Sequence, residues 1–458
     1  MNGLPPVALI AASVLLPLLY PLLAVRPGWQ GTLRRALPLL PLPALALALL
    51  SAAPWALDLP WLVLGSTWML DELRRSFLLL TALLWAGAGL YAVGYLGTVQ
   101  LRRFCVFWGL TLAGNIGLVL AGDIVSFYTF FALMTFAGYG LVVHDGSDRA
   151  RFAGRVYLVM ALLGEMALLA GFLLAARALD GLLLADLAAG ITASDRGGLM
   201  TALFIAGFGV KAGLPLLHFW LPLAHPVAPT PASAVLSGAM IKAGLLGWLL
   251  TLPLGEAGWA SWGQFLMVLG FVGSLGAALF GVAQRDPKTV LAWSSISQMG
   301  LMAVLVGAAL AAPAQAPALL PVIALFALHH GLAKGCLFLA VGLVLPVGRL
   351  WRVLLGLLLA LPALSLLGAP LTSGELAKGM MKGVLLAAPD LPLAPQLPLL
   401  LHAATLATLL LVARYGWMLW LRLEPGRAAA SVWWGWGLTV LCSGLLFWWL
   451  PGVALPGG

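Results

Sequence analysis

The chain is a succession of long apolar segments joined by short polar connections. Runs of roughly 20 apolar residues recur from end to end, and each is long enough to cross a hydrocarbon layer of about 30 Å as a helix. A membrane barrel would instead show segments of about ten residues in which apolar and polar positions alternate. The pattern therefore predicts an all-α polytopic membrane protein.

We expect fourteen transmembrane helices. Their predicted ranges are 4–25, 36–53, 74–96, 102–121, 123–144, 152–177, 199–217, 232–252, 262–284, 288–311, 317–345, 353–386, 397–421 and 431–450. The longest polar interruption lies near 178–197, which is too short for a soluble domain. A single membrane domain over residues 1–458 is therefore expected.

Composition supports this class and excludes others. The chain is 62% hydrophobic and 9% charged, whereas soluble domains average about 25% charged residues. Cys105, Cys336 and Cys442 each lie alone in an apolar segment, without the spacing of zinc or iron–sulfur ligands. With no glycine-rich phosphate loop after a strand either, we expect no cofactor, no metal and no redox centre belonging to this chain.

The net charge of +9 reports membrane orientation and not nucleic-acid binding. Connections after even-numbered segments hold few basic residues, chiefly Arg74, Arg75, Arg177 and Arg196. Those after odd-numbered segments hold Arg26, Arg34, Arg35, Arg102, Arg103, Arg149, Arg151, Arg155, Arg285, Lys288, Arg349, Arg352, Arg422 and Arg427. Basic residues are retained in the cytoplasm. We therefore expect both termini outside the cytoplasm, in a bacterial-type plasma (inner) membrane.

Lysine is rare and is placed differently from arginine. Only 6 of the 24 basic residues are lysines, and Lys211, Lys242 and Lys334 lie inside apolar segments. Each costs about 2.5–3.5 kcal/mol to insert at mid-membrane. Arginine stays charged, whereas a buried lysine can exchange its proton. The pattern favours proton handling, with snorkelling lysines or purely structural ion pairs as the alternative.

The seventh segment is interrupted beside its lysine. In the stretch GFGVKAGLPLLHFWLP, Pro215 follows Lys211 by one turn, and His218 and His225 lie beyond it. Broken helices near ionisable groups mark ion sites in transporters. A rigid proline-rich loop with the histidines on its surface is the alternative interpretation.

Two later segments carry further titratable groups. His330 and Lys334 are four residues apart and share a helix face. In GAPLTSGELAKGMMKG, a proline and a glycine interrupt the twelfth segment before Glu375, Lys378 and Lys382. Glu375 and Lys378 have the spacing of a local salt bridge, and Lys382 is expected to reach the interface.

The layout suggests an inverted repeat. The seventh and twelfth segments share a break and a lysine and are five segments apart, an odd offset that reverses the direction of travel. We predict helices 1–3 in 1–100, a first repeat (helices 4–8) in 101–252, a second (helices 9–13) in 262–421 and a last helix in 431–458.

Four motifs together resemble a known family. They are KAGLPLLHFWLPLAHPVAPTPASAVLSGAMIK, RDPKTVLAWSSISQMG, HHGLAKGCLF and PLTSGELAK. The chain, over about residues 70–420, resembles the antiporter-like membrane subunits of respiratory complex I (NADH:quinone oxidoreductase), Mrp-type cation/proton antiporters and energy-converting membrane hydrogenases. The resemblance implies fourteen core helices, two inverted five-helix repeats and a central proton-conducting axis of Lys, His and Glu.

The resemblance also implies residue roles. Lys211 matches the central lysine of helix 7 and Lys242 the bridging lysine of helix 8. The remaining matches are His330 and Lys334 on helix 11, Lys378 on helix 12, and Lys288, Ser294 and Ser295 on helix 10. One position departs: relatives carry an acid in a pattern like FYxFWEL, and here FYTFFALMTF places Ala132 there. We expect Glu165 on helix 6 to take over its pairing with Lys211 or Lys242, with a structural ion pair as the alternative.

These residues predict a subunit that translocates protons or Na⁺ in a redox-driven pump or a cation/proton antiporter. Expected partners are other membrane subunits, a redox or soluble peripheral module and membrane lipid, with no nucleic acid. Two alternatives stay open, a non-conducting scaffold and the membrane subunit of an inorganic-carbon uptake complex.

Overall fold

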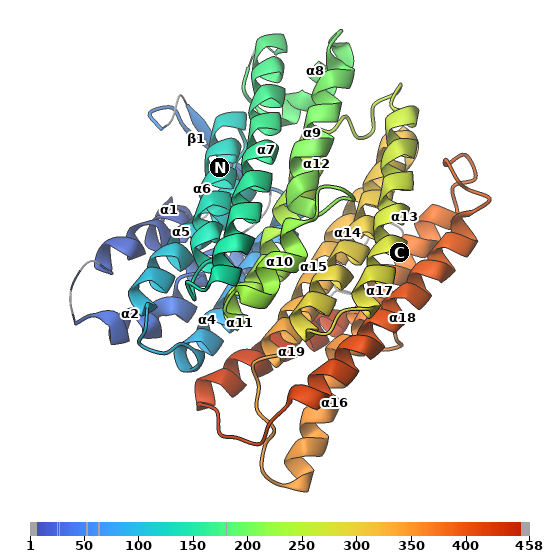
Figure 1. The fold of residues 1–458 in the computed structure, drawn as a ribbon. Helices are drawn as coiled ribbons and strands as arrows, with labels where there is room; N and C mark the ends of the chain where they lie inside the picture. Colours follow the sequence, from blue (N-terminus) through green and yellow to red (C-terminus); the bar gives the residue numbers. More distant parts are fainter. Residues whose placement is uncertain are drawn as a thin grey trace.

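The computed structural model describes residues 7–449 except 25, 27, 52–53, 63–64 and 180. Within this part of the chain the fold is a bundle of long helices with one small β-hairpin (Figure 1). The ends of the first and last predicted helices, at 4–6 and 450, lie outside the described residues.

The first half of the chain contributes seven helical segments before the first break. They are α1 (Val7–Leu23), α2 (Gln30–Ala36) continued by η1 (Leu37–Leu39) and α3 (Leu42–Leu50), α4 (Glu72–Tyr95), α5 (Leu101–Leu120), α6 (Ile124–Val142), α7 (Asp148–Ala178) and α9 (Gly197–Ala212). A short η2 (Leu184–Asp186) and α8 (Leu187–Ala193) fill the long polar interruption.

The rest of the chain follows α9. Its elements are α10 (Trp220–Val227), α11 (Thr230–Val235), η3 (Leu236–Met240), α12 (Lys242–Thr251), α13 (Ala260–Val282), α14 (Pro287–Ala311), η4 (Pro313–Gln315), α15 (Ala316–Ala340), α16 (Arg349–Leu367), α17 (Ser373–Leu386), α18 (Leu397–Arg422) and α19 (Ala430–Trp449).

The predicted class, an all-α integral membrane protein, is confirmed. Twelve helical segments of the described chain are long and apolar enough to span a membrane. The first and seventh predicted spans correspond to α1 and α9, which at 17 and 16 residues are shorter. The count of fourteen therefore stays a prediction.

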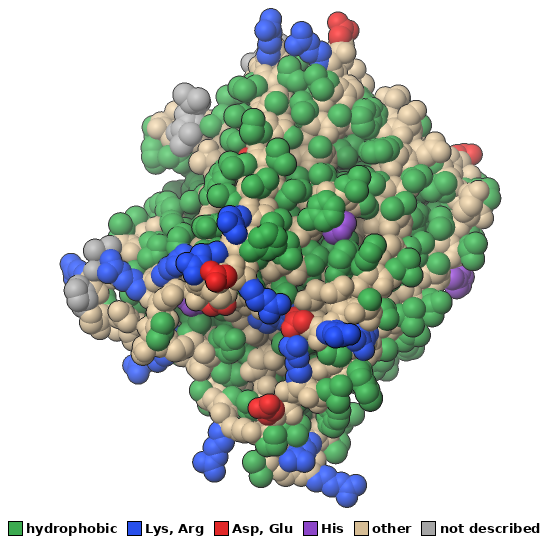
Figure 2. All heavy atoms as spheres, in the orientation of Figure 1, with side chains coloured by type: hydrophobic (Ala, Val, Ile, Leu, Met, Phe, Trp, Pro, Cys, Tyr) green, Lys and Arg blue, Asp and Glu red, His purple; other side chains and the backbone are tan. Residues whose placement is uncertain are grey.

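Figure 2 shows apolar side chains over most of one face, with charged side chains gathered at its upper tip and across its lower part.

Burial separates central helices from peripheral ones. In the most apolar stretch of α15 every residue is buried, and in those of α14 and of the segment α11–α12 94% of the residues are buried. In the corresponding stretches of α16 and α18 only 22% and 33% of the residues are buried. The apolar side chains of these two helices are therefore exposed to lipid. The central helices α14 and α15 lie between the group α7, α9 and α12 and the C-terminal helices (Figure 1). The helices that bear Lys288 and Lys334 therefore form the centre.

Side-chain caps set where several of these uniformly apolar helices begin. The carboxylates of Asp71, Asp123 and Asp286 accept hydrogen bonds from the backbone N–H three residues later, at the starts of α4, α6 and α14. Ser147 does the same for α7. Such caps satisfy N–H groups that a helix cannot pair internally, at about 1 kcal/mol each.

The two predicted helix breaks are confirmed. After α9, Gly213 adopts a φ of 80° and Leu216 a φ of 67°, and the N–H groups of Gly213 and Leu214 both donate to Gly209 O at 2.9 Å. Pro215 has no N–H with which to continue the helix. The second break follows α16, where Gly368 has a φ of 82° and α17 resumes at Ser373.

The connection between α3 and α4 holds a β-hairpin that the sequence pattern did not predict. Strands β1 (Trp55–Leu59) and β2 (Ser66–Leu70) pair antiparallel with Trp55 opposite Leu70. The hairpin docks on the helices because Asp123, the cap of α6, also accepts a hydrogen bond from Thr67 N at 2.9 Å. Five-residue strands fall below the length of the apolar runs from which the helices were predicted.

The eighth predicted helix is irregular at its middle. Between α11 and α12, η3 is a π-helical turn, and Ile241 N donates five residues back to Leu236 O at 3.2 Å. This turn packs directly on α15, because a Cβ added to Gly238 would lie 2.8 Å from Gly331 O, and one added to Gly331 would lie 2.6 Å from Gly238 O. Two facing glycines thus let the backbones touch.

Gly238→Val should separate η3 from α15. The new side chain would collide with the backbone of Gly331, and overpacking of this kind costs about 1–3 kcal/mol. We expect a lower melting temperature for the detergent-purified protein. Gly379→Val on α17 is the control, because a Cβ there meets nothing within 4 Å. Equal melting temperatures for the two variants would contradict the close packing.

Candidate functional site

Three buried lysines each donate a hydrogen bond to a backbone carbonyl oxygen. Lys242 Nζ lies 2.7 Å from Ser237 O, Lys288 Nζ 2.7 Å from Ala228 O, and Lys334 Nζ 3.0 Å from Leu291 O. Lys334 is fully buried, and Lys242 and Lys288 are 1% and 8% exposed. An unpaired charge in a hydrocarbon-like interior would cost several kcal/mol. The carbonyls therefore make these positions tolerable.

The π-turn supplies the carbonyl for Lys242. In a regular α-helix, Ile241 N would donate to Ser237 O, four residues back. Here Ile241 N donates to Leu236 O, and Ser237 O accepts from the lysine instead. The helix irregularity and the buried lysine thus form one local structure, consistent with the occurrence of π-bulges at functional sites.

Two serine hydroxyls lie between the carbonyl groups that bind Lys242 and Lys334. Ser237 Oγ lies 2.7 Å from Ser295 Oγ on α14, and Ser295 Oγ donates to Leu291 O at 2.9 Å. The same Leu291 O accepts the bond from Lys334 on α15. Polar groups of η3, α14 and α15 therefore lie next to one another, with each ammonium bound to a carbonyl oxygen. Ser294 is buried beside it, but its hydroxyl has no hydrogen-bond partner.

The two histidines of α15 have different surroundings. His330 is fully buried, and neither of its ring nitrogens has a hydrogen-bond partner. His329 Nδ1 lies 2.9 Å from Ser373 Oγ and 3.4 Å from Ser365 Oγ. His329 thus ties α15 to the second helix break, whereas His330, one turn before Lys334, makes no such contact.

Lys211 has a separate, aromatic environment. Its ammonium lies 3.5 Å from Tyr157 Oη and 5.6–5.9 Å from the ring centroids of Phe131, Tyr157 and Trp220. Trp220 is fixed across the helix break by its indole N–H, which donates to Val210 O at 2.8 Å. Cation–π contacts stabilise an ammonium without holding it to one acceptor.

Glu165 lines the same small cavity as Lys211. The carboxylate is buried and neither oxygen has a hydrogen-bond partner, yet Lys211 Nζ is not within 4.0 Å of it. The cavity offers about 20 Å³ to the centres of water molecules, enough for one water. Ala132 is half-buried and does not line this cavity, although its neighbours Phe131 and Thr135 do.

The remaining candidates, His218, Lys378 and Glu375, lie at the two helix breaks. His218 is half-buried, with Nδ1 3.3 Å from Leu214 O. Lys378 is buried against Gly368 at the second break. The local salt bridge between Glu375 and Lys378 is wrong, because Glu375 is exposed and its carboxylate instead accepts from Leu371 N at 2.7 Å. Capping its own helix start satisfies that carboxylate.

Several polar residues of the site escaped sequence reasoning. Ser237, Tyr157 and Trp220 lie in apolar helices, where a single hydroxyl or indole gives no pattern that marks its partner. His225 and Lys288 were predicted as secondary candidates, and they lie near the N-terminal end of α14.

Among the described residues, no group of three or more His, Cys, Asp or Glu side chains is placed to hold a metal ion.

Comparisons with known proteins agree with this architecture. The family described as NADH:quinone oxidoreductase/Mrp antiporter, TM, matches residues 121–389. The chain belongs to this family. It is 31% identical over 364 residues to NADH-quinone oxidoreductase subunit N of Desulforudis audaxviator (strain MP104C), covering 73% of this chain and 70% of that protein.

Other relatives of the antiporter family are longer than this chain. Hydrogenase-4 component B of Escherichia coli (strain K12) is 32% identical over 295 residues, which are 61% of this chain and 43% of that protein. A chain in the structure of the Mrp complex from Dietzia sp. DQ12-45-1b shares the fold, with a TM-score of 0.82 at 24% identity, over 98% of this chain and 51% of that one. The chain thus spans about half the length of each of these two proteins.

Lys211→Met should leave Glu165 buried without a nearby cation. Breaking a buried pair by removing one partner costs about 3–5 kcal/mol, so the single variant should unfold more easily than the double variant with Glu165→Gln. Unfolding in detergent, followed by circular dichroism, measures this difference. Lys382→Met is the control, since Lys382 is half-exposed. Equal stability of the single and double variants would show that the two charges do not interact.

Proposed function

We propose that the chain is an ion-translocating subunit of a multi-subunit membrane complex, either a redox-driven pump or a cation/proton antiporter. The observation that carries this proposal is the line Lys242–Ser237–Ser295–Leu291–Lys334, formed by hydrogen bonds inside the bundle. Buried lysines can release and accept protons, which arginines in the same places could not do. The transported ion is a proton, or Na⁺ exchanged for protons.

Lys211 and Glu165 control the release of protons into this path. The negative charge of Glu165 stabilises the ammonium form of Lys211 across their shared cavity. Protonating or moving that carboxylate removes the stabilisation, and Lys211 then gives its proton toward Lys242, His330, Lys334 and Lys378. Glu165 thereby takes the pairing role of the acid absent at Ala132. The driving energy comes from a partner subunit or an ion gradient.

The chain functions beside other membrane subunits. The names of similar proteins, a hydrogenase component, an antiporter complex and an NADH-quinone oxidoreductase subunit, all belong to assemblies. Both termini lie outside the cytoplasm of a bacterial-type inner membrane, as the arginine distribution suggests. The breaks after α9 and α16 occupy equivalent places in two inverted repeats, 101–252 and 262–421.

A second candidate function is a non-conducting scaffold. The absence of an acid at position 132 favours it, as does the lack of a direct contact between Glu165 and Lys211. The retained lysines favour translocation, because a scaffold gains nothing from three ammonium groups that must be desolvated.

Lys211→Ala should abolish coupled proton movement. In vesicles that contain the complete complex, a pH-sensitive dye should report almost no signal for this variant, and Glu165→Gln should be nearly as damaging because Lys211 loses its counter-charge. Glu375→Gln is the control, since that carboxylate is exposed. Normal proton movement in Lys211→Ala would remove Lys211 from the path, and a silent Glu165→Gln would favour the scaffold.

A further inference from the structure

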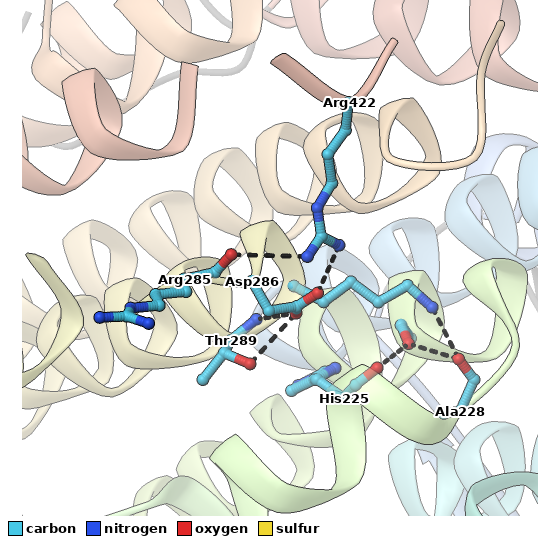
Figure 3. A network of polar contacts seen from close by, with 8 residues as sticks. His225, Ala228, Arg285, Asp286, Thr289 and Arg422 are labelled. Atoms are coloured by element: carbon cyan, nitrogen blue, oxygen red, sulfur yellow. Dashed lines mark hydrogen bonds and ion pairs between the residues drawn. The ribbon is translucent and has the colours of Figure 1, made fainter. Parts of the chain in front are cut away.

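One end of α14 carries an ion pair at the protein surface. Arg422, the last residue of α18, donates through Nη1 to Asp286 Oδ1 at 2.7 Å and through Nη2 to Arg285 O at 3.4 Å (Figure 3). The two side chains are 51% and 31% exposed. Asp286 also caps α14 by accepting from Thr289 N and Oγ1 at 2.9 and 3.1 Å. Asp286 is therefore held by its own helix, whereas Arg422 is the more exposed partner of the pair.

Two residues after Asp286, the side chain of Lys288 points into the protein. Lys288 Nζ donates to Ala228 O at 2.7 Å, at the junction of α10 and α11. Ser233 Oγ donates to the same oxygen at 3.3 Å and to His225 O at 3.0 Å. The ammonium of Lys288 and the hydroxyl of Ser233 thus share Ala228 O, and Ser233 in turn contacts the backbone of His225.

His225 is a buried polar group without a structural explanation. It is fully buried, and neither ring nitrogen has a hydrogen-bond partner. Its ring stacks on Phe338 with centroids 4.5 Å apart, and Phe338 lies one helical turn after Lys334 on α15. The imidazole is also within electrostatic range of Lys288, Lys334 and Lys242. Burying an imidazole without hydrogen-bond partners costs stability, and a role as a proton carrier would account for its position here.

We propose that Asp286, Lys288 and His225 form the surface entrance of the proton path, and that the Asp286–Arg422 ion pair closes it. This inference deepens the proposed function and rests on it. When Arg422 moves away, the Asp286 carboxylate becomes an acceptor for a proton from bulk water. Arg422 itself cannot serve as a carrier because its guanidinium stays protonated.

After each proton transfer, the group that gave the proton is neutral or deprotonated and can accept the next one. The Lys288 ammonium gives one proton to a neutral ring nitrogen of His225 and becomes an amine, which Asp286 reprotonates from water at the surface. His225 then gives a proton to the neutral amine of Lys334 and returns to its neutral form. Water carries the proton where two groups are not in hydrogen-bond contact.

The alternative is that the ion pair only fastens the α13–α14 connection to α18. The chain offers a matched control for this alternative. Arg414 also lies on α18 and fastens the same connection, donating through Nε and Nη2 to Gln284 O at 3.1 and 2.8 Å. It makes no hydrogen bond with Asp286. Loss of Arg414 should thus disturb the connection without removing the closure.

The rate at which a thiol at position 288 reacts measures closure directly. Lys288→Cys is introduced after Cys105, Cys336 and Cys442 are replaced by serine, and a cationic methanethiosulfonate is added to the complete complex. Adding Arg422→Gln should speed the reaction about fivefold, the ratio set by an exposed ion pair worth about 1 kcal/mol. Arg414→Gln should leave the rate within about twofold. An unchanged rate in Arg422→Gln, or equal acceleration in both, would overturn the closure.

The route itself is tested at His225. His225→Phe keeps a ring against Phe338 but removes the proton carrier, so proton movement in vesicles should fall about tenfold or more, while the thiol at position 288 reacts as before. His402→Phe on the exposed side of α18 is the control. Undiminished proton movement in His225→Phe would overturn the route. If Lys211→Ala is also undiminished, the proposed function fails as well, whereas the thiol measurement stands independently of transport.

Discussion

An ammonium group buried among apolar helices needs an oxygen atom, and in this protein the oxygen comes from the backbone. Ser237, Ala228 and Leu291 each direct a carbonyl at a lysine, from a π-turn, a helix end and the body of α14. Regular helices use almost all of their carbonyls internally. The irregular turn η3 and the end of α10 provide free carbonyls for Lys242 and Lys288, whereas Leu291 O accepts from Lys334 within the body of α14.

Lys211 lies outside this arrangement, which distinguishes two ways of burying a charge. Carbonyl oxygens hold Lys242, Lys288 and Lys334 in fixed directions. Lys211 instead faces aromatic rings, a tyrosine hydroxyl and a cavity shared with Glu165. Aromatic rings and a carboxylate that is not in direct contact do not hold the ammonium in one geometry. Small movements of these groups can therefore change how strongly the charge on Lys211 is stabilised. This contrast is why we assign the switching step to Lys211 and the conducting steps to the carbonyl-bound lysines.

Apolar run length was sufficient to predict the helices, because spanning a membrane leaves few alternatives to a helix. The break at Pro215 was equally accessible, since a missing N–H and a neighbouring glycine act locally. The π-turn could not be predicted, because nothing in residues 236–240 indicates that a backbone N–H will bond to the carbonyl five residues back and not four. The hairpin 55–70 was missed because its short strands lack an apolar run.

In the candidate site, too, some residues could be predicted from the sequence and others could not. Lys211, Lys242 and Lys334 stand out in the sequence because charge is rare in apolar segments. Their partners do not, since the contact of Ser237 with Ser295 joins residues 58 positions apart and depends on helix rotation. The pair Asp286–Arg422 spans 136 positions and was hidden among charges that the sequence assigned to topology. Glu375 shows the converse, because helical spacing predicted a salt bridge where a helix cap formed.

The central claim is that the buried lysines exchange protons and do more than carry charge. Lys334→Arg in the complete complex tests this most directly, because arginine keeps the charge and can still donate to Leu291 O but does not release its proton. With assembly verified by sedimentation, proton movement across vesicles is the measurement. The account predicts that movement is lost although the complex assembles. Undiminished proton movement in this variant would contradict it.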